Sequence, residues 1–241
     1  GDVVALFRAA GGPIQALLSI GSGAASLARG HRLERLGPRS VGVPGAPDGY
    51  AALHRQARLA LSQLVAPAAA AARDGVHWRR TSLSYLAESR DLLARWSPDC
   101  VYMAEIEPRV GDVMRLPGLA TLLEDFAKTG SELFWGVVGE RLCAELAARG
   151  GFLDAADLRI RPAHVCGAAA VTLQGGQMLY ATPAPTHGQL LLEAIARLES
   201  GEMDAATVVA ELRNAGVNGR DSGNSVVSAA DVAREASDVV L

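Results

Sequence analysis

The sequence predicts an α+β domain, because strand-like segments occur near both ends of the chain and helix-like segments lie between them. The 241 residues are 49% hydrophobic and 20% charged, which is enough apolar material for a core and too little charge for a disordered chain. Aromatic residues make up only 5%, so Ala, Leu and Val must form most of the core. The length fits one domain, which we assign to residues 1–241.

The first part of the chain predicts a β-hairpin followed by a rigid loop. Val3–Phe7 and Ile14–Ile20 are strand-like and flank a Gly-Gly pair. Residues 36–49 contain three prolines and four glycines, which indicates a loop with fixed turns. Asp48 is placed to cap a helix that starts near Tyr50. The same loop could instead form the wall of a ligand pocket.

The remaining elements follow from apolar spacing and from glycine and proline stops. The predicted helices are 50–64, 67–75 (opened by Pro67), 82–96, 117–130, 131–150, 187–198 and 204–214. A second hairpin is predicted from the strands 164–173 and 177–181, which flank Gly175-Gly176. Two further strand-like segments, 225–230 and 239–241, end the chain.

Charge and composition exclude several classes of partner. The net charge of −3 at pH 7 argues against a nucleic-acid-binding protein, which normally has a basic excess. No apolar run reaches the ~20 residues that span a bilayer, and no secretory signal is recognisable at the first residues. We therefore expect no nucleic-acid and no membrane partner, and a cytoplasmic location.

Spacing alone does not assemble a catalytic or metal site. The three cysteines and five histidines are scattered, so we predict free, buried thiols and no metal. Gly21-Ser22-Gly23 follows a strand, but it lacks the third glycine and the later acidic residue of a dinucleotide loop, so a structural turn is favoured. The arginines at 29, 32, 35, 39, 79 and 80 could form a basic patch or a solvated face.

Four groups of residues, each weak alone, occur in a fixed order along the chain. They are Ser40-Val41-Gly42-Val43-Pro44-Gly45 with Gly49 and Leu53-His54; Leu64, Pro67-Ala68, Ala72 and Gly75; Gly111-Asp112, Pro117, Leu119-Ala120 and Leu123; and Phe134-Trp135-Gly136 with Gly150-Gly151 and Asp157-Leu158. In this order and spacing they resemble the γ-glutamyltransferase (γ-glutamyltranspeptidase) family of N-terminal-nucleophile hydrolases. The resemblance covers roughly residues 1–231.

The resemblance implies a four-layer αββα sandwich, of which this chain holds largely the helical large-subunit portion. It implies a precursor that cuts itself before a threonine, whose new α-amino group then acts as base for its own hydroxyl. The implied activity is hydrolysis or transfer of γ-glutamyl groups from glutathione-like amides, with no cofactor. Compared with the family pattern, we expect the chain to be incomplete at both ends.

The resemblance places substrate-binding residues on the turn after the second strand, at Ser22 and Gly23. Family members carry an arginine in this region that clamps the α-carboxylate of the substrate. Here Ala24 stands at the arginine position and Arg29 is the nearest arginine, so a charge-assisted bidentate contact is missing. This departure bears on specificity for γ-glutamyl groups.

The resemblance also places the catalytic nucleophile near the end of the chain. The position of the expected threonine falls on Asn224, which has no hydroxyl group for attack on a carbonyl carbon. A shift of one residue in register would give this role to Ser225.

Three hypotheses follow from these observations. The first is a γ-glutamyltransferase-like hydrolase or acyltransferase that acts on a small peptide or amide when it is complemented by a small catalytic subunit or C-terminal half. The second is a divergent relative that acts on a different, non-glutamyl substrate in secondary metabolism. The third is a catalytically degenerate homologue.

Overall fold

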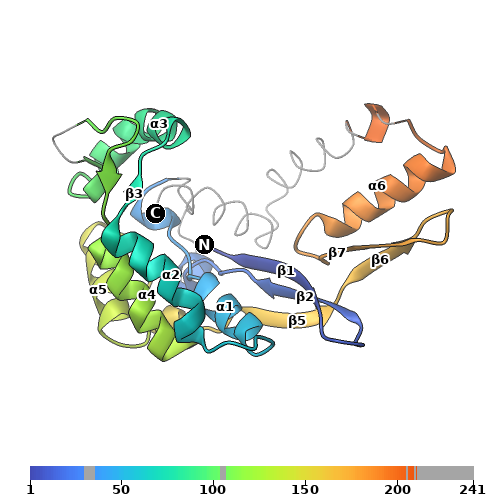
Figure 1. Ribbon diagram of the computed structural model, residues 1–241, viewed down its shortest axis with the longest axis horizontal. Coiled ribbons are helices and arrows are strands. Elements are labelled where there is room, and N and C mark those ends of the chain that lie inside the picture. The colour runs from blue at the N-terminus through green and yellow to red at the C-terminus, as the bar shows by residue number, and fades with distance from the viewer. Residues whose placement is uncertain (30–35, 104–106, 205, 209, 211–241) are drawn as a thin grey trace.

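The computed structural model describes residues 1–29, 36–103, 107–204, 206–208 and 210 (Figure 1). It is a mixture of helices and strands, as the sequence predicts. The predicted strands 225–230 and 239–241 lie outside the described residues. Of the predicted helix 204–214, residues 206–208 and 210 are described and are helical.

A three-stranded antiparallel sheet forms the centre of the body. It consists of β1 (Val3–Arg8), β2 (Ile14–Ser19) and β5 (Ala163–Gly167), in the order β1-β2-β5. The β1–β2 hairpin confirms the first sequence prediction, and Gly11 in its turn has a φ of 72°, which glycine adopts without strain. Pairing of Leu17 with Val165 brings β5 from the far part of the chain to this hairpin.

One face of this sheet is covered by helix α1 (Ala46–His54). Because side chains alternate along a strand, Val3 and Leu17 share this face, and both pack against Ala52 of α1. Leu17 has 0% of its surface exposed. Gly49 lets the helix approach closely, since a Cβ there would lie 2.7 Å from the Cβ of Val3. This contact is one of two buried apolar clusters among the described residues.

A helical layer surrounds α1 (Figure 1). Its elements are α2 (Leu61–Asp74), α3 (Arg80–Trp96), α4 (Pro117–Thr129) and α5 (Val137–Ala148), with the short strands β3 (Val76–His77) and β4 (Val113–Met114) and the 3-10 turns η1 (Ala25–Arg29), η2 (Pro38–Ser40), η3 (Val101–Met103), η4 (Gly130–Glu132) and η5 (Asp157–Arg159). Helices α2 and α4 pack side by side and are joined by an ion pair between Arg73 and Glu124. Tyr50 of α1 meets Phe126 of α4 edge to face, with 6.4 Å between ring centroids.

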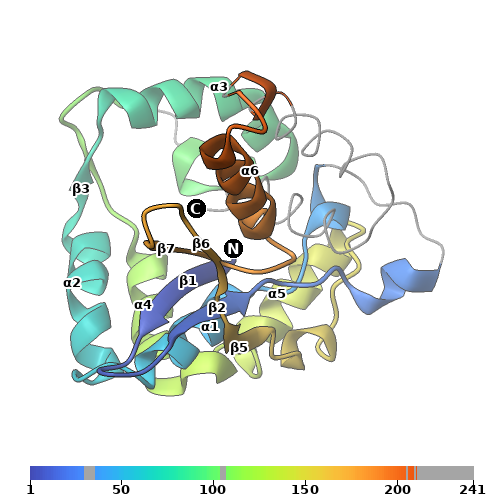
Figure 2. The same cartoon turned by 90° about the vertical axis from the view of Figure 1, so that its right-hand side faces the viewer.

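Strands β6 (Ala169–Thr172) and β7 (Met178–Ala181) and helix α6 (Gly188–Ser200) form an arm that projects from the body in Figure 1 and points toward the viewer in Figure 2. The two strands make the second predicted hairpin, and α6 packs on it. The predicted single strand 164–173 is divided at Ala168, between β5 and β6. The arm therefore continues the chain of the central sheet but has its own two-stranded ladder.

Three helix boundaries differ from the sequence predictions. The predicted helix 50–64 is two helices, because the chain leaves the helix at residues 55–60, which contain neither proline nor glycine. Pro67 lies inside α2 and does not open it, so its ring removes one helical hydrogen bond without ending the helix. The segment 131–150 begins as the 3-10 turn η4, and α5 starts only at Val137 after Gly136.

Candidate functional site

The predicted substrate-binding residues lie on the turn that follows β2, which we call the Gly21–Ala25 turn. Ser22 and Gly23 are exposed at the middle of this turn, whereas Gly21 and Ala24 on either side of them are buried. The alternation presents one serine side chain and one glycine backbone to solvent. Ala24, at the position of the expected arginine, is 3% exposed and packs with Val43, Leu153 and Leu158, so this position points into the core.

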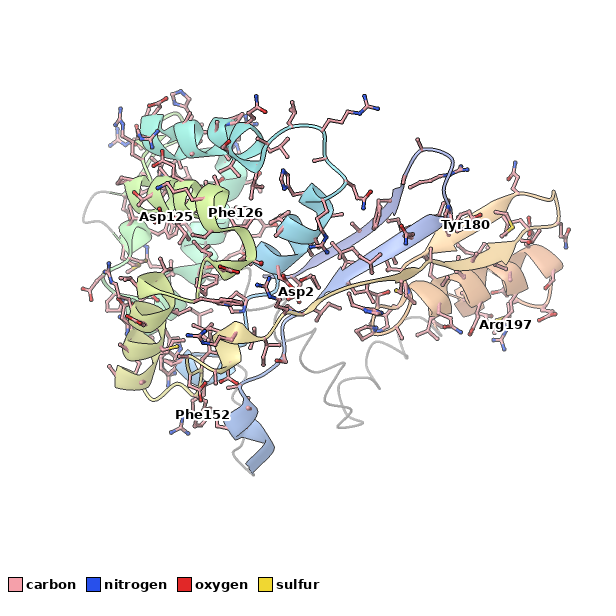
Figure 3. The ribbon with its side chains drawn as sticks, turned by 90° about the horizontal axis from the view of Figure 1, so that it is seen from below. Asp2, Asp125, Phe126, Phe152, Tyr180 and Arg197 are labelled. Atoms are coloured by element: carbon pink, nitrogen blue, oxygen red, sulfur yellow. The ribbon has the colours of Figure 1, made fainter. Side chains whose placement is uncertain are left out.

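Three hydrogen bonds hold the backbone of the turn. At one end, the N–H of Gly21 donates to Asp2 Oδ1 over 2.9 Å. At the other end, the N–H of Ala25 donates to Asp157 Oδ1 over 2.9 Å. Between them, the N–H of Val43 donates to the carbonyl oxygen of Ser22 over 2.8 Å. Figure 3 labels Asp2 at the start of β1 and Phe152 beside η1, on the two sides of the turn.

The glycine-rich and proline-rich loop packs directly against this turn. A Cβ on Gly21 would lie 1.7 Å from the carbonyl oxygen of Val43, and a Cβ on Gly42 would lie 2.8 Å from that of Ser22. Both distances are shorter than any real Cβ contact, so the two chain segments cross only because these positions lack side chains. The crossing explains why glycines are needed at the two positions.

Asp157 is the most deeply buried carboxylate of this region, with 2% of its surface exposed. Its Oδ2 accepts a second hydrogen bond from the N–H of Asp154 over 3.1 Å. Asp154 in turn accepts hydrogen bonds from the N–H groups of Ala156 and Asp157 through its Oδ1. In the sequence Asp157 stands out only as part of a motif, because its partner at Ala25 is 132 residues away.

Asp48 has a different role from the predicted helix cap. Helix α1 begins at Ala46, so Asp48 already lies in its first turn and makes no capping hydrogen bond. Its Oδ2 accepts the N–H of Ala163 over 2.9 Å, and its Oδ1 pairs with Arg161 over 3.6 Å. The guanidinium of Arg161 also lies 4.5 Å from the ring centroid of Trp135. Asp48 therefore joins α1 to the start of β5.

Two titratable groups near the turn have altered proton affinities. Burial raises the pKa of the Asp2 carboxyl, and its hydrogen bond from Gly21 only partly offsets that effect. Burial also raises the pKa of the Cys143 thiol, and the negative charges of Asp154 and Asp157 act in the same direction. Cys143 is consequently protonated at neutral pH and is a poor nucleophile.

The other predicted site features are only partly visible. Asn224 and Ser225 lie outside the described residues. Cys100, Cys143 and Cys166 are free as predicted, but they are half-buried and not buried. Within the described ranges, no cluster of three His, Cys, Asp or Glu residues could hold a metal ion, and no helix is long and apolar enough to cross a membrane.

The predicted basic patch is also only partly described. The guanidinium of Arg39 lies 5.4 Å from the ring centroid of Phe152, and its Nε donates to the carbonyl oxygen of Gly150. Arg80 is the first residue of α3. Arg39 therefore packs on the segment that precedes Asp157 and does not extend freely into solvent.

Comparison with known proteins gives consistent matches. The family model for gamma-glutamyltranspeptidase matches residues 19–219. The chain is 34% identical over 160 residues to glutathione hydrolase 5 proenzyme of Homo sapiens, which covers 64% of this chain and 27% of that protein. It is 32% identical over 177 residues to the Mus musculus protein of the same name, covering 71% and 31%. The chain thus spans about three-tenths of the length of these relatives.

Solved structures support the same fold. The Helicobacter pylori gamma-glutamyltranspeptidase superposes with a TM-score of 0.75 at 21% identity, over 86% of this chain and 63% of that one. A cephalosporin acylase from Bacillus halodurans superposes with a TM-score of 0.72 at 26% identity, over 80% and 39%. These likenesses confirm the expected N-terminal-nucleophile hydrolase class of α+β fold. Because the family model matches residues 19–219, which is most of this chain, the chain belongs to the gamma-glutamyltranspeptidase family.

Proposed function

We propose that this chain is the large-subunit-like portion of an enzyme that hydrolyses or transfers γ-glutamyl groups from glutathione-like amides. The observation that carries the proposal is the family match over residues 19–219, together with curated relatives named glutathione hydrolases. In the structure, the matched region starts at the end of β2 and includes the Gly21–Ala25 turn. The turn is fixed at both ends and exposes Ser22 and Gly23, as a substrate-contacting segment requires.

The proposed reaction is acyl transfer through a hydroxyl nucleophile. The base takes the hydroxyl proton as the hydroxyl oxygen attacks the γ-carbonyl carbon of the amide. It then passes this proton to the nitrogen as the C–N bond breaks and the amine leaves. Water or a second amine then attacks the acyl-enzyme ester and regenerates the hydroxyl. Asn224 cannot supply that hydroxyl, so the nucleophile is either Ser225 or a residue of a catalytic partner.

The central sheet supports the need for such a partner. Val4 and Leu6 of β1 point away from α1 and are 45% and 42% exposed, although both are large apolar residues. A second sheet stacked about 10 Å away would remove them from water, as in other layered folds. We therefore propose that a small catalytic subunit or C-terminal half packs on this face.

The test is turnover of γ-glutamyl-p-nitroanilide by the chain expressed together with a C-terminal half from a family member. Release of p-nitroaniline by the complex, and none by the chain alone, is the expected result. The proposal fails if a purified, processed two-chain complex releases no p-nitroaniline. Intact-mass measurement follows processing, and a chain that never splits between Gly223 and Asn224 refutes the cleavage position predicted here.

A second candidate function is cleavage of an amide that lacks the α-carboxylate. The buried position of Ala24 favours it, because no arginine extends from that site toward a substrate. The relative named cephalosporin acylase shows that this fold also occurs in a protein named for another substrate. Comparison of γ-glutamyl-p-nitroanilide with 4-aminobutyryl-p-nitroanilide, which has no α-carboxylate, separates the two candidates. Faster release from the 4-aminobutyryl compound would favour the second.

A further inference from the structure

The Gly21–Ala25 turn is held by two carboxylates that lie far apart in the sequence. Asp2 precedes β1, and Asp157 begins η5 after the helical layer. Each accepts one backbone N–H of the turn, and the exposed residues Ser22 and Gly23 lie between these two points. The geometry of the exposed pair therefore depends on where the two carboxylates sit.

Of these two carboxylates, that of Asp157 is the more deeply buried. It is almost completely buried, and its two carboxylate oxygens accept one N–H from the turn and one from its own segment. Within the described ranges it forms no ion pair, so its charge is compensated by backbone N–H groups. Burial of a carboxylate is costly, whereas hydrogen bonds to a charged acceptor are stronger than those to a neutral one. The buried carboxylate therefore fixes the position of the Gly21–Ala25 turn relative to the segment 152–158, at a cost in desolvation free energy.

Residues on either side of Ala25 make further contacts with the segment that contains Asp157. Ala24, directly before Ala25, packs with Leu153 and Leu158 on either side of Asp157 in the sequence. Ser26 Oγ, directly after Ala25, donates to the carbonyl oxygen of Phe152 over 3.4 Å. The segment 152–158 therefore meets the turn through apolar contacts and hydrogen bonds together.

We propose that Asp157 is a positioning residue, which fixes the Gly21–Ala25 turn so that Ser22 and Gly23 are presented to the substrate. This inference rests on the proposed function, in which that turn contacts the substrate. Asp157 itself is buried behind the turn and acts through it. Its loss changes substrate binding, expressed in KM, more than the chemical step, expressed in kcat.

Three variants in the active two-chain complex test the proposal. Asp157→Ala removes both hydrogen bonds, and Asp157→Asn keeps one acceptor oxygen. Asp154→Ala is the matched control, because among the described residues the Asp154 side chain accepts hydrogen bonds from Ala156 and Asp157 of its own segment and none from the turn. The measurements are KM and kcat for γ-glutamyl-p-nitroanilide, and hydrogen exchange of the peptide that contains residues 21–27.

For Asp157→Ala we expect KM to rise about tenfold, since one charge-assisted hydrogen bond is typically worth that factor, while kcat changes less than twofold. Exchange in residues 21–27 should accelerate. Asp157→Asn should recover part of both effects, and Asp154→Ala should stay close to wild type. Equal effects of Asp157→Ala and Asp154→Ala, or unchanged exchange in residues 21–27, would overturn the proposal. Where the wild-type complex releases no p-nitroaniline, the proposed function has failed, and exchange alone decides whether Asp157 holds the turn.

Discussion

The two faces of the central sheet are built from similar residues but have opposite surroundings. On the face toward α1, Val3 and Leu17 are buried against Ala52. On the other face, Val4 and Leu6 of the edge strand are nearly half exposed, whereas Ala16 and Leu18 of the central strand are buried. The first face contributes to the stability of this chain. The exposed part of the second face gains its stabilisation only when another layer covers it.

The largest effect is expected from the face toward α1. Leu17→Ala removes a fully buried side chain from the contact between β2 and α1, which typically costs about 3 kcal/mol of unfolding free energy. The measurement is denaturant unfolding of the chain followed by far-UV circular dichroism. A loss no larger than that of an exposed leucine would remove the distinction between the two faces.

A smaller effect on the same face is expected at Ser19. Its Oγ is buried and donates to the carbonyl oxygen of Gly45 over 2.7 Å, which joins β2 to the loop before α1. Ser19→Ala leaves that carbonyl without this donor, and the expected cost is about 1 kcal/mol. Denaturant unfolding measures it. Ser84→Ala is the control, because Ser84 is exposed and its hydroxyl, among the described residues, donates a hydrogen bond to Glu88 of the same helix, so the variant should have almost no effect.

A pH-dependent effect is expected at Asp2. Since burial raises its folded-state pKa above the unfolded value, the protonated form is favoured in the folded chain. The stabilisation from Asp2 is therefore present below the unfolded pKa and is lost as pH rises through the folded pKa. Asp2→Asn keeps an oxygen acceptor for the N–H of Gly21 and cannot ionise, so it does not lose stability as pH rises. The Tm of the variant relative to wild type should be higher at pH 7 than at pH 3.5, and the reverse order would contradict the assignment.

The smallest effect on this chain alone is expected at Leu6. Because this side chain is 42% exposed, Leu6→Ala should cost the isolated chain well under 1 kcal/mol. In the complex with a catalytic half, the same variant should weaken association, measured by co-purification at equal expression. Loss of stability in the isolated chain comparable with that of Leu17→Ala would show that the exposed face is already packed.

Local signals predicted most of the elements. Glycine pairs marked both hairpins, and Gly75 and Gly130 stop their helices with positive φ values, as expected from a residue without a Cβ. The end of α1 was missed because residues 55–60 carry no breaking residue. In that segment the end of the helix has no local sequence marker.

The candidate site was less accessible to sequence reasoning. Ser22 and Gly23 lie on an exposed turn, and the groups that fix this turn were not predicted. Asp157 and Asp48 act on backbone N–H groups 132 and 115 residues away, at Ala25 and Ala163. Such pairings depend on the complete topology. From a single sequence, neither aspartate can be matched with the distant N–H group to which it bonds.

The late arrival of β5 has a consequence for synthesis of the protein. While the ribosome is still making the helical layer, β1 and β2 can pair only with each other, and α1 is the one described element already made that packs on their face. The third strand emerges after residue 163, and Asp157 emerges just before it. The β1–β2 hairpin therefore leaves the ribosome well before the strand that completes its sheet, so the free edge of β2 remains unpaired while residues 20–162 are made.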